Sequence, residues 1–173
     1  LLRAAGVDGC EYEANTDDAA FHPGRCARVL IGGKCAGMIG EVHPAVCENY
    51  QIGTRAYIAY LDETVLFENV APERGYSPLP RFPAATRDLA LICDDALPVA
   101  ALEKAIRSAV GSTLEELTLF DVYRGAQVAD GKKSVAYSLT MRAADRTLTD
   151  EESDAAVKRA LKALRTIGAE LRS

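Results

Sequence analysis

The sequence contains no tryptophan and only two histidines and two methionines among its 173 residues. No stretch approaches the roughly 18 consecutive apolar residues that a membrane-spanning helix needs, so we expect no membrane partner. Neither sign of charge dominates, because 20 Lys and Arg residues stand against 25 Asp and Glu residues. The net charge of −5 excludes a chain that binds nucleic acid through overall basic charge alone.

The five cysteines do not form the pattern of a disulfide framework. Their number is odd, and no two of them are separated by only two residues. Small secreted domains that depend on disulfides carry paired, closely spaced cysteines. We therefore expect free thiols and a reducing compartment, the cytoplasm.

Two histidine–cysteine pairs share one spacing, His22-x3-Cys26 and His43-x3-Cys47, and four such ligands could close a tetrahedral zinc site. Each histidine precedes a proline, which favours extended backbone over a shared helical face. A Cys–His nucleophile pair from the same residues lacks a third group at a recognisable spacing to orient it. We expect both histidines to form hydrogen bonds in turns, and we predict no catalytic residue, no metal and no cofactor in this chain.

A proline-rich segment divides the chain into two parts. Four prolines fall within the twelve residues 72–83, and proline neither continues a helix nor donates to a central strand. We therefore predict a first domain over residues 1–70, a linker over 71–83 and a second domain over 84–173.

The first part has the pattern of an antiparallel α+β fold. Two stretches, Ala27–Ile31 and Cys35–Val42, flank the pair Gly32-Gly33, which indicates a hairpin. The segment Arg55–Leu61 is apolar at both odd and even positions, which is typical of a strand buried on both faces. These segments favour the end of a larger mixed domain.

The second part reads as a β-α-β-β-α-β unit. Strands are expected over Asp88–Cys93, Leu117–Tyr123, Ser134–Met141 and Glu170–Arg172, with helices between Pro98 and Gly111 and between Thr149 and Gly168. Thr149 and Glu152 form a capping box at the start of the second helix. This order lays four strands over two helices and leaves one sheet face open, so we predict an α+β chain whose second domain is a ferredoxin-like sandwich.

The open sheet face is the candidate site, because such a face can hold splayed single-stranded RNA bases. We expect Tyr137 and its alternate neighbours to face the helices, which leaves Ser134, Ser138 and Arg142 on the open side. Phe120 and Arg124 are expected to share one face of the neighbouring strand, with Tyr123 on the other.

Cations complete this candidate surface. Lys132 and Lys133 are expected in the loop Gly125–Lys133, and Arg87 is expected at the start of the first strand. The predicted RNA-binding residues are Arg87, Phe120, Tyr123, Arg124, Lys132, Lys133, Ser134, Ser138 and Arg142. For each of them the alternative is a structural role, with the aromatic residues in the core and the cations on a solvated rim.

Several motifs resemble the C-terminal end of the β subunit of bacterial phenylalanyl-tRNA synthetase. In the first part the resemblance is carried by Phe21-His22-Pro23-Gly24-Arg25 and Gly37-x-Ile39-Gly40-Glu41-Val42-His43-Pro44. In the second part it is carried by Pro80-Arg81-Phe82-Pro83-Ala84-x-x-Arg87-Asp88-Leu89-Ala90, Leu119-Phe120-Asp121-Val122-Tyr123-x-Gly125, Lys132-Lys133-Ser134-x-Ala136-Tyr137 and Arg146-Thr147-Leu148-Thr149-Asp150-x-Glu152. Their order and spacing together make the resemblance specific.

The resemblance implies that the first part ends a module with the class II synthetase fold but without its active site. It implies that the second part is a ferredoxin-fold anticodon-binding domain, which contacts the anticodon stem-loop of phenylalanine tRNA. The family enzyme uses ATP and Mg²⁺ and consists of two α and two β subunits. The chain would thus be a non-catalytic, cytoplasmic fragment of a phenylalanine–tRNA ligase.

Two other functions compete with this interpretation. The chain could be a structural module for assembly with the α subunit, without RNA contacts of its own, since many functions share the ferredoxin-like fold. It could also be a zinc enzyme that uses His22, Cys26, His43 and Cys47. Salt-sensitive RNA binding and metal analysis would separate these functions.

Overall fold

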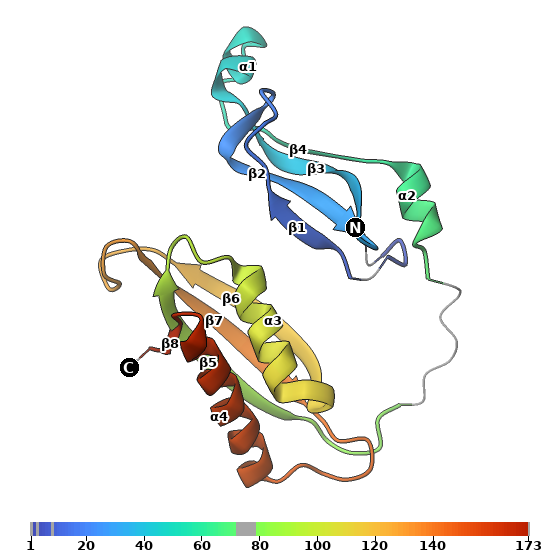
Figure 1. Cartoon of the computed structure of the whole chain (residues 1–173), viewed down its shortest axis with the longest axis vertical. Helices are drawn as coiled ribbons and strands as arrows, with labels where there is room; N and C mark the ends of the chain where they lie inside the picture. The colour runs from blue at the N-terminus through green and yellow to red at the C-terminus, as the bar shows by residue number, and fades with distance from the viewer. Residues whose placement is uncertain (1, 3, 8, 72–78, 173) are drawn as a thin grey trace. The chain divides into compact units, whose positions relative to one another are not determined.

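The computed structural model describes residues 2, 4–7, 9–71 and 79–172 (Figure 1). The chain divides into two compact units, Leu1–Ser77, called unit 1 below, and Pro78–Ser173, called unit 2. Most of the linker predicted over residues 71–83 lies outside the described residues, because these stop at residue 71 and resume at residue 79. Among the helices of the described ranges, none has the length and apolar composition of a membrane span.

Unit 1 is built on a four-stranded antiparallel sheet. Its elements are β1 (Glu11–Ala14), β2 (Phe21–Ile31), β3 (Lys34–Val42), α1 (Pro44–Asn49), β4 (Tyr57–Leu61) and α2 (Glu63–Glu68), and the strand order is β1-β2-β3-β4. Gly32 and Gly33 form the turn between β2 and β3 with φ values of +57° and +77°. Glycine adopts such left-handed angles without steric cost, and the predicted hairpin is confirmed.

The prediction of a fully buried strand over Arg55–Leu61 is wrong. Among the described residues β4 is an edge strand that pairs only with β3, and the side chains of Tyr57 and Tyr60 are 65% and 53% exposed. The segment is apolar on both faces, but this pattern does not reveal whether another element covers the strand. Within the described residues of unit 1, no element buries these two tyrosines.

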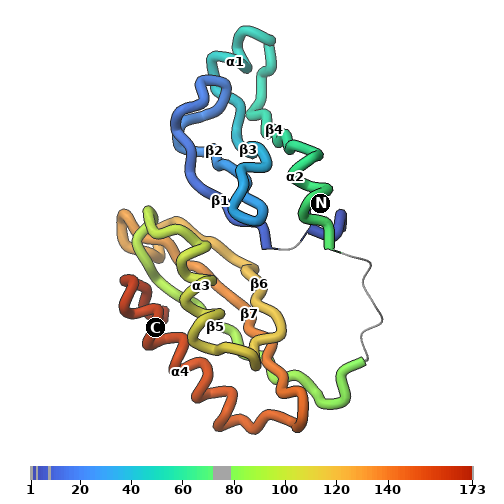
Figure 2. Tube along the Cα trace, turned by 45° about the vertical axis from the view of Figure 1, so that its right-hand side comes forward, coloured from blue at the N-terminus to red at the C-terminus, as the bar shows by residue number. Residues whose placement is uncertain are grey.

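Unit 2 has the predicted β-α-β-β-α-β order and the ferredoxin-like fold. Its elements are β5 (Ala85–Asp94), α3 (Val99–Val110), the short 3₁₀ turn Gly111–Thr113, β6 (Leu114–Tyr123), β7 (Lys132–Met141), α4 (Asp150–Thr166) and β8 (Glu170–Leu171). The strand order is β6-β7-β5-β8 and all neighbours are antiparallel. Figures 1 and 2 show α3 and α4 on the same face of this sheet.

The core of unit 2 lies between the two helices and the sheet. α3 buries Leu102 and Ile106, and α4 buries Ala160 and Leu164. From the sheet, alternate residues of β7 project into the same cluster, which confirms the predicted face; these residues are Val135, Tyr137, Leu139 and Met141.

The predicted capping box at the start of α4 is confirmed. The hydroxyl of Thr149 accepts a hydrogen bond from the Glu152 backbone N–H at 3.2 Å, and the Glu152 carboxylate accepts one from the Thr149 N–H at 3.0 Å. Two otherwise unpaired backbone donors are thereby satisfied at the helix terminus. Arg146 contacts the same carboxylate, and these hydrogen bonds, first that from Thr149, lower the pKa of Glu152.

We expect Tyr137→Ala to destabilise unit 2 by about 3–5 kcal/mol, because it leaves a cavity beneath both helices. Tyr137 is fully buried, and its hydroxyl donates to the carbonyl of Val99 at 3.4 Å. Tyr137→Phe removes only that long hydrogen bond and should cost about 1 kcal/mol. Urea unfolding of the whole chain measures both changes. Equal stabilities of the Ala variant and the parent would contradict the face assignment.

Glu41 gives unit 1 a pH-dependent contribution to stability. This buried carboxylate of β3 accepts two hydrogen bonds from Arg25, at 2.8 and 3.0 Å, and lies 3.9 Å from Arg55. The hydrogen bonds from Arg25 are the main reason that the pKa of Glu41 lies below its ordinary value. A lowered folded-state pKa adds stability above the unfolded-state pKa of about 4.3, and this stability is lost as the pH falls through the folded-state pKa.

We therefore expect the Tm of the parent chain to fall more steeply below about pH 4.3 than the Tm of the Glu41→Gln variant. At pH 7 the variant should melt at the lower temperature, because the neutral amide cannot replace the charged pair. Thermal melts of both proteins at pH 7 and in acid give this difference. Parallel curves would show that the Arg25–Glu41 pair does not contribute.

Candidate nucleic-acid interface

The candidate interface is the sheet face of unit 2 that lies opposite α3 and α4, called the open face below. Directly opposed residues of antiparallel strands project to the same side. Because Tyr137 faces the helices, Ser138 must lie on the open face, together with Asp88 and Thr118, which are opposite it on β5 and β6. The predicted placement of the small residues of β7 on this face is confirmed.

Tyr123 also lies on the open face. Leu119 is opposite Tyr137, Asp121 is opposite Ala136 and Tyr123 is opposite Ser134, so Phe120 is an extra residue in the ladder. Such a β-bulge shifts the alternation of all later residues by one. Regular alternation would have put Tyr123 beside the helices. Phe120 itself is 58% exposed, so neither aromatic residue belongs to the core.

The ring of Tyr123 lies against the backbone of Gly125. A Cβ atom placed on Gly125 would be only 2.5 Å from the Tyr123 hydroxyl oxygen, a distance that no side chain could tolerate without moving the ring. The glycine of the Tyr123-x-Gly125 motif therefore leaves room for the phenol. With 36% of its surface exposed, Tyr123 offers part of a ring to a ligand.

A row of opposed residues crosses the sheet from this ring. Tyr123 is followed by Ser134, then Ile92, then Glu170 on β8. The predicted contact residue Ser134 is buried, and its hydroxyl accepts a hydrogen bond from Arg172 at 3.5 Å. Arg172 also donates to Gln127 at 3.0 Å. Sequence reasoning missed Arg172 because a closing strand this short has no alternation to show its face.

The two lysines predicted in a polar loop begin strand β7 instead. Lys133 is 4% exposed, and its ammonium group donates to the carbonyls of Asp95 at 2.8 Å and Leu97 at 2.7 Å. It therefore secures the turn before α3 and is not available to RNA. Lys132 is exposed and lies 3.7 Å from the carboxylate of Asp94, its opposed residue. The loop prediction was wrong because two cations at a strand start look like a solvated loop.

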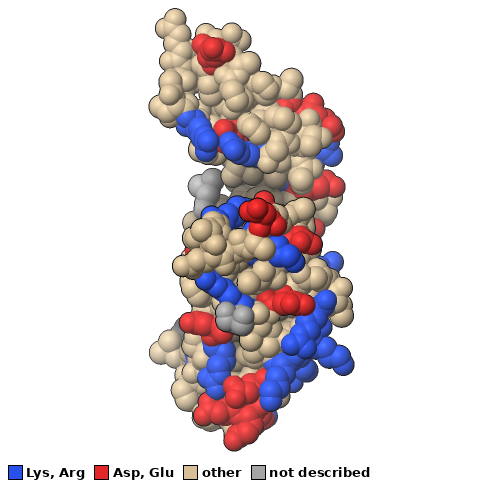
Figure 3. Space-filling view, turned by 90° about the vertical axis from the view of Figure 1, so that its left-hand side faces the viewer, with Lys and Arg blue, Asp and Glu red and all other residues tan. Residues whose placement is uncertain are grey.

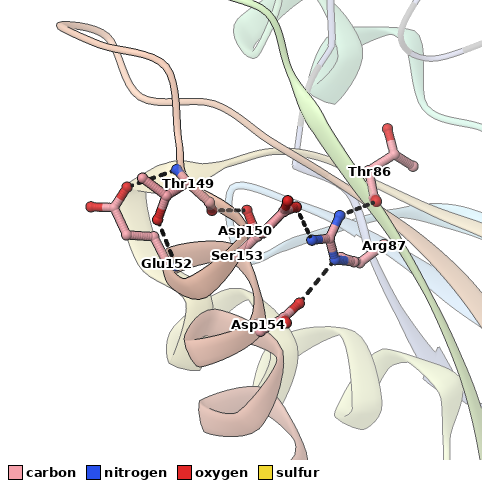
Figure 4. A network of polar contacts seen from close by, with 7 residues as sticks. All are labelled: Thr86, Arg87, Thr149, Asp150, Glu152, Ser153 and Asp154. Carbon is pink, nitrogen blue, oxygen red and sulfur yellow. Dashed lines mark hydrogen bonds and ion pairs between the residues drawn. The ribbon is translucent and has the colours of Figure 1, made fainter.

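Arg87 lies on the helix side of β5 and contacts α4, so it is not on the open face. Its guanidinium lies between two carboxylates, at 2.6 Å from Asp150 and 3.1 Å from Asp154, and donates to the carbonyl of Thr86 at 3.1 Å (Figure 4). Arg87 thus joins β5 to the first turns of α4. The RNA contact predicted for Arg87 stays a prediction, but its side chain does not lie on the open face where that contact was expected.

The two other predicted arginines are also held by neighbours. Arg124 lies 2.6 Å from the Asp95 carboxylate and remains mostly exposed. Arg142 contacts Glu115 at 2.8 Å and donates to the carbonyl of Phe82, the residue that leads into the domain. Arg142 therefore ties the start of unit 2 to the end of β7.

The open face is more acidic than basic. Its five carboxylates belong, by strand pairing, to Asp88, Asp94, Glu116, Asp121 and Glu170. Its cations are Lys132 and Arg172, with Arg142 directly after the end of β7, and each of these three has a polar partner. This electrostatic pattern suits neutral bases better than phosphates, which need unpaired cations.

The two histidines form the turn hydrogen bonds that we predicted. Nδ1 of His22 accepts from the Gly24 N–H at 3.1 Å, and Nδ1 of His43 accepts from the Ala45 N–H at 3.2 Å, at the start of α1. Across the described ranges, no three His, Cys, Asp or Glu side chains gather into a group that could hold a metal ion. The repeated spacing of His22 and Cys26 and of His43 and Cys47 therefore does not gather these side chains into a metal site among the described residues.

Comparison with known proteins gives matches to both units. The family described as "Ferredoxin-fold anticodon binding domain" matches residues 80–172, and "Phenylalanyl tRNA synthetase beta chain CLM domain" matches residues 1–62. The "Phenylalanine--tRNA ligase beta subunit" of Symbiobacterium thermophilum is 48% identical over 173 residues, which cover 100% of this chain and 19% of that relative. The protein of the same name from Clostridium acetobutylicum is 43% identical, over 99% of this chain and 22% of its own length. The chain thus spans about a fifth of the length of these relatives.

The structure assigns opposite roles to the two neighbouring lysines. We expect Lys133→Ala to lower the free energy of unfolding by about 1.5–3 kcal/mol, because it removes two charge-assisted hydrogen bonds and leaves two carbonyls without their donor. Lys132→Ala is the matched control and should change stability by less than about 0.5 kcal/mol. Chemical denaturation compares the two variants. Equal effects would show that Lys133 is not a structural residue.

Proposed function

Because the chain belongs to the family of ferredoxin-fold anticodon binding domains, with a phenylalanyl tRNA synthetase beta chain CLM domain before it, we propose that it is a tRNA-binding part of a phenylalanine–tRNA ligase β subunit. Unit 2 would contact the anticodon stem-loop of phenylalanine tRNA. The observation that supports this proposal most directly is Tyr123, which the bulge at Phe120 turns onto the open face beside small side chains.

The proposed contact uses bases more than phosphates. Tyr123 offers a partly exposed ring, and Ala136 and Ser138 are too small to keep a base away from the sheet. A splayed loop base can stack on such a ring while its edge forms hydrogen bonds with neighbouring hydroxyl groups. The carboxylates Asp88 and Asp121 can accept hydrogen bonds from base amino groups.

Binding of the loop would serve to orient the tRNA. Contacts far from the reacting 3′ end convert binding energy into correct placement of the acceptor end in an active site elsewhere. In this proposal the ATP- and Mg²⁺-dependent chemistry belongs to the α subunit, within an assembly of two α and two β subunits in the cytoplasm. No residue of this chain is assigned to either cofactor.

An assembly role is the second candidate, and the surface of unit 1 favours it. Large apolar side chains of β3 and β4 are exposed on both faces of the sheet, Ile39 and Tyr57 on one face and Ile58 and Tyr60 on the other. Exposed apolar groups on neighbouring strands are typical of a surface that a protein partner covers. This role of unit 1 is compatible with RNA binding by unit 2, whereas an assembly role for the whole chain is not.

Titration of the whole chain with the phenylalanine tRNA anticodon stem-loop, and with a stem-loop whose loop is scrambled, tests the proposal. We expect tighter binding to the true loop, because bases are read only there. Tyr123→Ala should weaken that binding by about 5- to 150-fold, the equivalent of roughly 1–3 kcal/mol of lost stacking. Gly125→Ala, which displaces the same ring, should have a similar effect on affinity. Absence of binding to either RNA would leave only the assembly role, whereas equal binding to both would show that the loop bases are not read.

A further inference from the structure

Unit 2 separates its charges between two surfaces. It contains 14 Lys and Arg and 14 Asp and Glu residues, so its net charge is zero. On the sheet, the cations Arg87, Arg124, Lys132 and Arg142 each contact a carboxylate. Six of the remaining cations lie on the two helices and are exposed: Lys104, Arg107, Lys158, Arg159, Lys162 and Arg165. Among the described residues, none of these six forms an ion pair with a carboxylate.

The later turns of α4 are the centre of this basic surface. Residues 155–166 include four cations and no carboxylate. Because an α-helix has 3.6 residues per turn, Lys158, Lys162 and Arg165 follow one another along a single outward row. The buried residues Ala156, Ala160 and Leu164 lie on the opposite side of the helix. This row, called the α4 row below, is about 10 Å long.

The surroundings keep the α4 row rigid and accessible. Arg159, one step around the helix, donates to the carbonyl of Ala109 at 3.2 Å and so links α4 to the end of α3. The acidic residues of α4 lie in its first turns, where Arg87 holds Asp150 and Asp154. Figure 3 views the chain from the side on which α4 lies in Figure 1 and shows Lys and Arg side chains in a continuous band beside an acidic group.

We propose that the α4 row binds the phosphate backbone of an RNA stem, so that the helix side supplies affinity while the open face reads bases. This inference rests on the proposed tRNA-binding function and names the surface that contacts the phosphates. Charge complementarity identifies the occupant, because unpaired cations in a row match a polyanion with evenly spaced charges. The row presents three cations over about 10 Å, so it can contact about two or three successive phosphates of one strand.

The position of α4 allows one RNA to reach both surfaces. α4 packs against β5 and β8, and β8 is the outer strand of the sheet. The row of opposed residues that begins at Tyr123 ends on β8 at Glu170, beside Arg172. An RNA that passes around the β8 edge therefore meets the α4 row on the helix side of the sheet. On the open face it meets Glu170, the last of the opposed residues that begin at Tyr123.

The test compares the whole parent chain with the triple variant Lys158→Gln/Lys162→Gln/Arg165→Gln. Both RNA stem-loops, with the true and the scrambled loop, are titrated at several salt concentrations. We expect the variant to bind both RNAs about ten-fold or more weakly, and the slope of log K against log salt to fall by about two to three. The loss should be equal for the two RNAs, because phosphate contacts do not depend on sequence.

The matched control is Arg28→Gln/Lys34→Gln/Arg55→Gln, which removes the same charge from exposed positions of unit 1. Thermal melts establish that all variants are folded. Parental affinity and salt slope in the helix variant, or an equal loss in the control, would overturn the α4 assignment while the proposed function stands. A parent chain that binds neither stem-loop would overturn both proposals.

Discussion

The packing of β7 against both helices is the interaction on which the rest of unit 2 depends. This strand is central, with β6 on one side and β5 on the other. Its helix-facing residues from Val135 to Met141 are fully buried. Because opposed residues of antiparallel strands project to the same face, this burial determines which face each opposed residue of β5 and β6 occupies. The open face, with Ser138 and Ala136 near its middle, is the direct consequence of this burial.

Much of unit 2 could be predicted because its local signals agree with its packing. The apolar stripe of α3, the Thr149–Glu152 capping box and the alternation of β7 each indicate the element that forms. A fold can be predicted from its sequence where the local preferences agree with the tertiary packing in this way. In unit 1 the pair Gly32-Gly33 equally indicates the hairpin turn that forms. The exposure of β4, in contrast, depends on which other elements cover the strand, and the periodicity of its own sequence does not show this.

The candidate site was less predictable, because the position of a residue in a motif does not tell which face it occupies. Arg87 and Lys133 stand in the expected motifs, but both project to the helix side and form structural contacts. Tyr123 changes side because of one extra residue at Phe120, and bulges have no reliable signature in a single sequence. Ser134 lies on the predicted face, but it is buried and accepts a hydrogen bond from Arg172, the residue after β8.

The distribution of charge along α4 gives unit 2 an electrical polarity although its net charge is zero. Acidic residues occupy the first turn and cations occupy the later turns, which follows the order that the helix dipole favours. The acidic group and the basic row thus form the two poles of a permanent dipole along the helix, whose 17 residues span about 25 Å. A polyanion in solution would exert a torque on such a domain and align its basic pole before any contact forms. Orientation of this kind increases the fraction of productive encounters, and it weakens when salt shortens the range of the field.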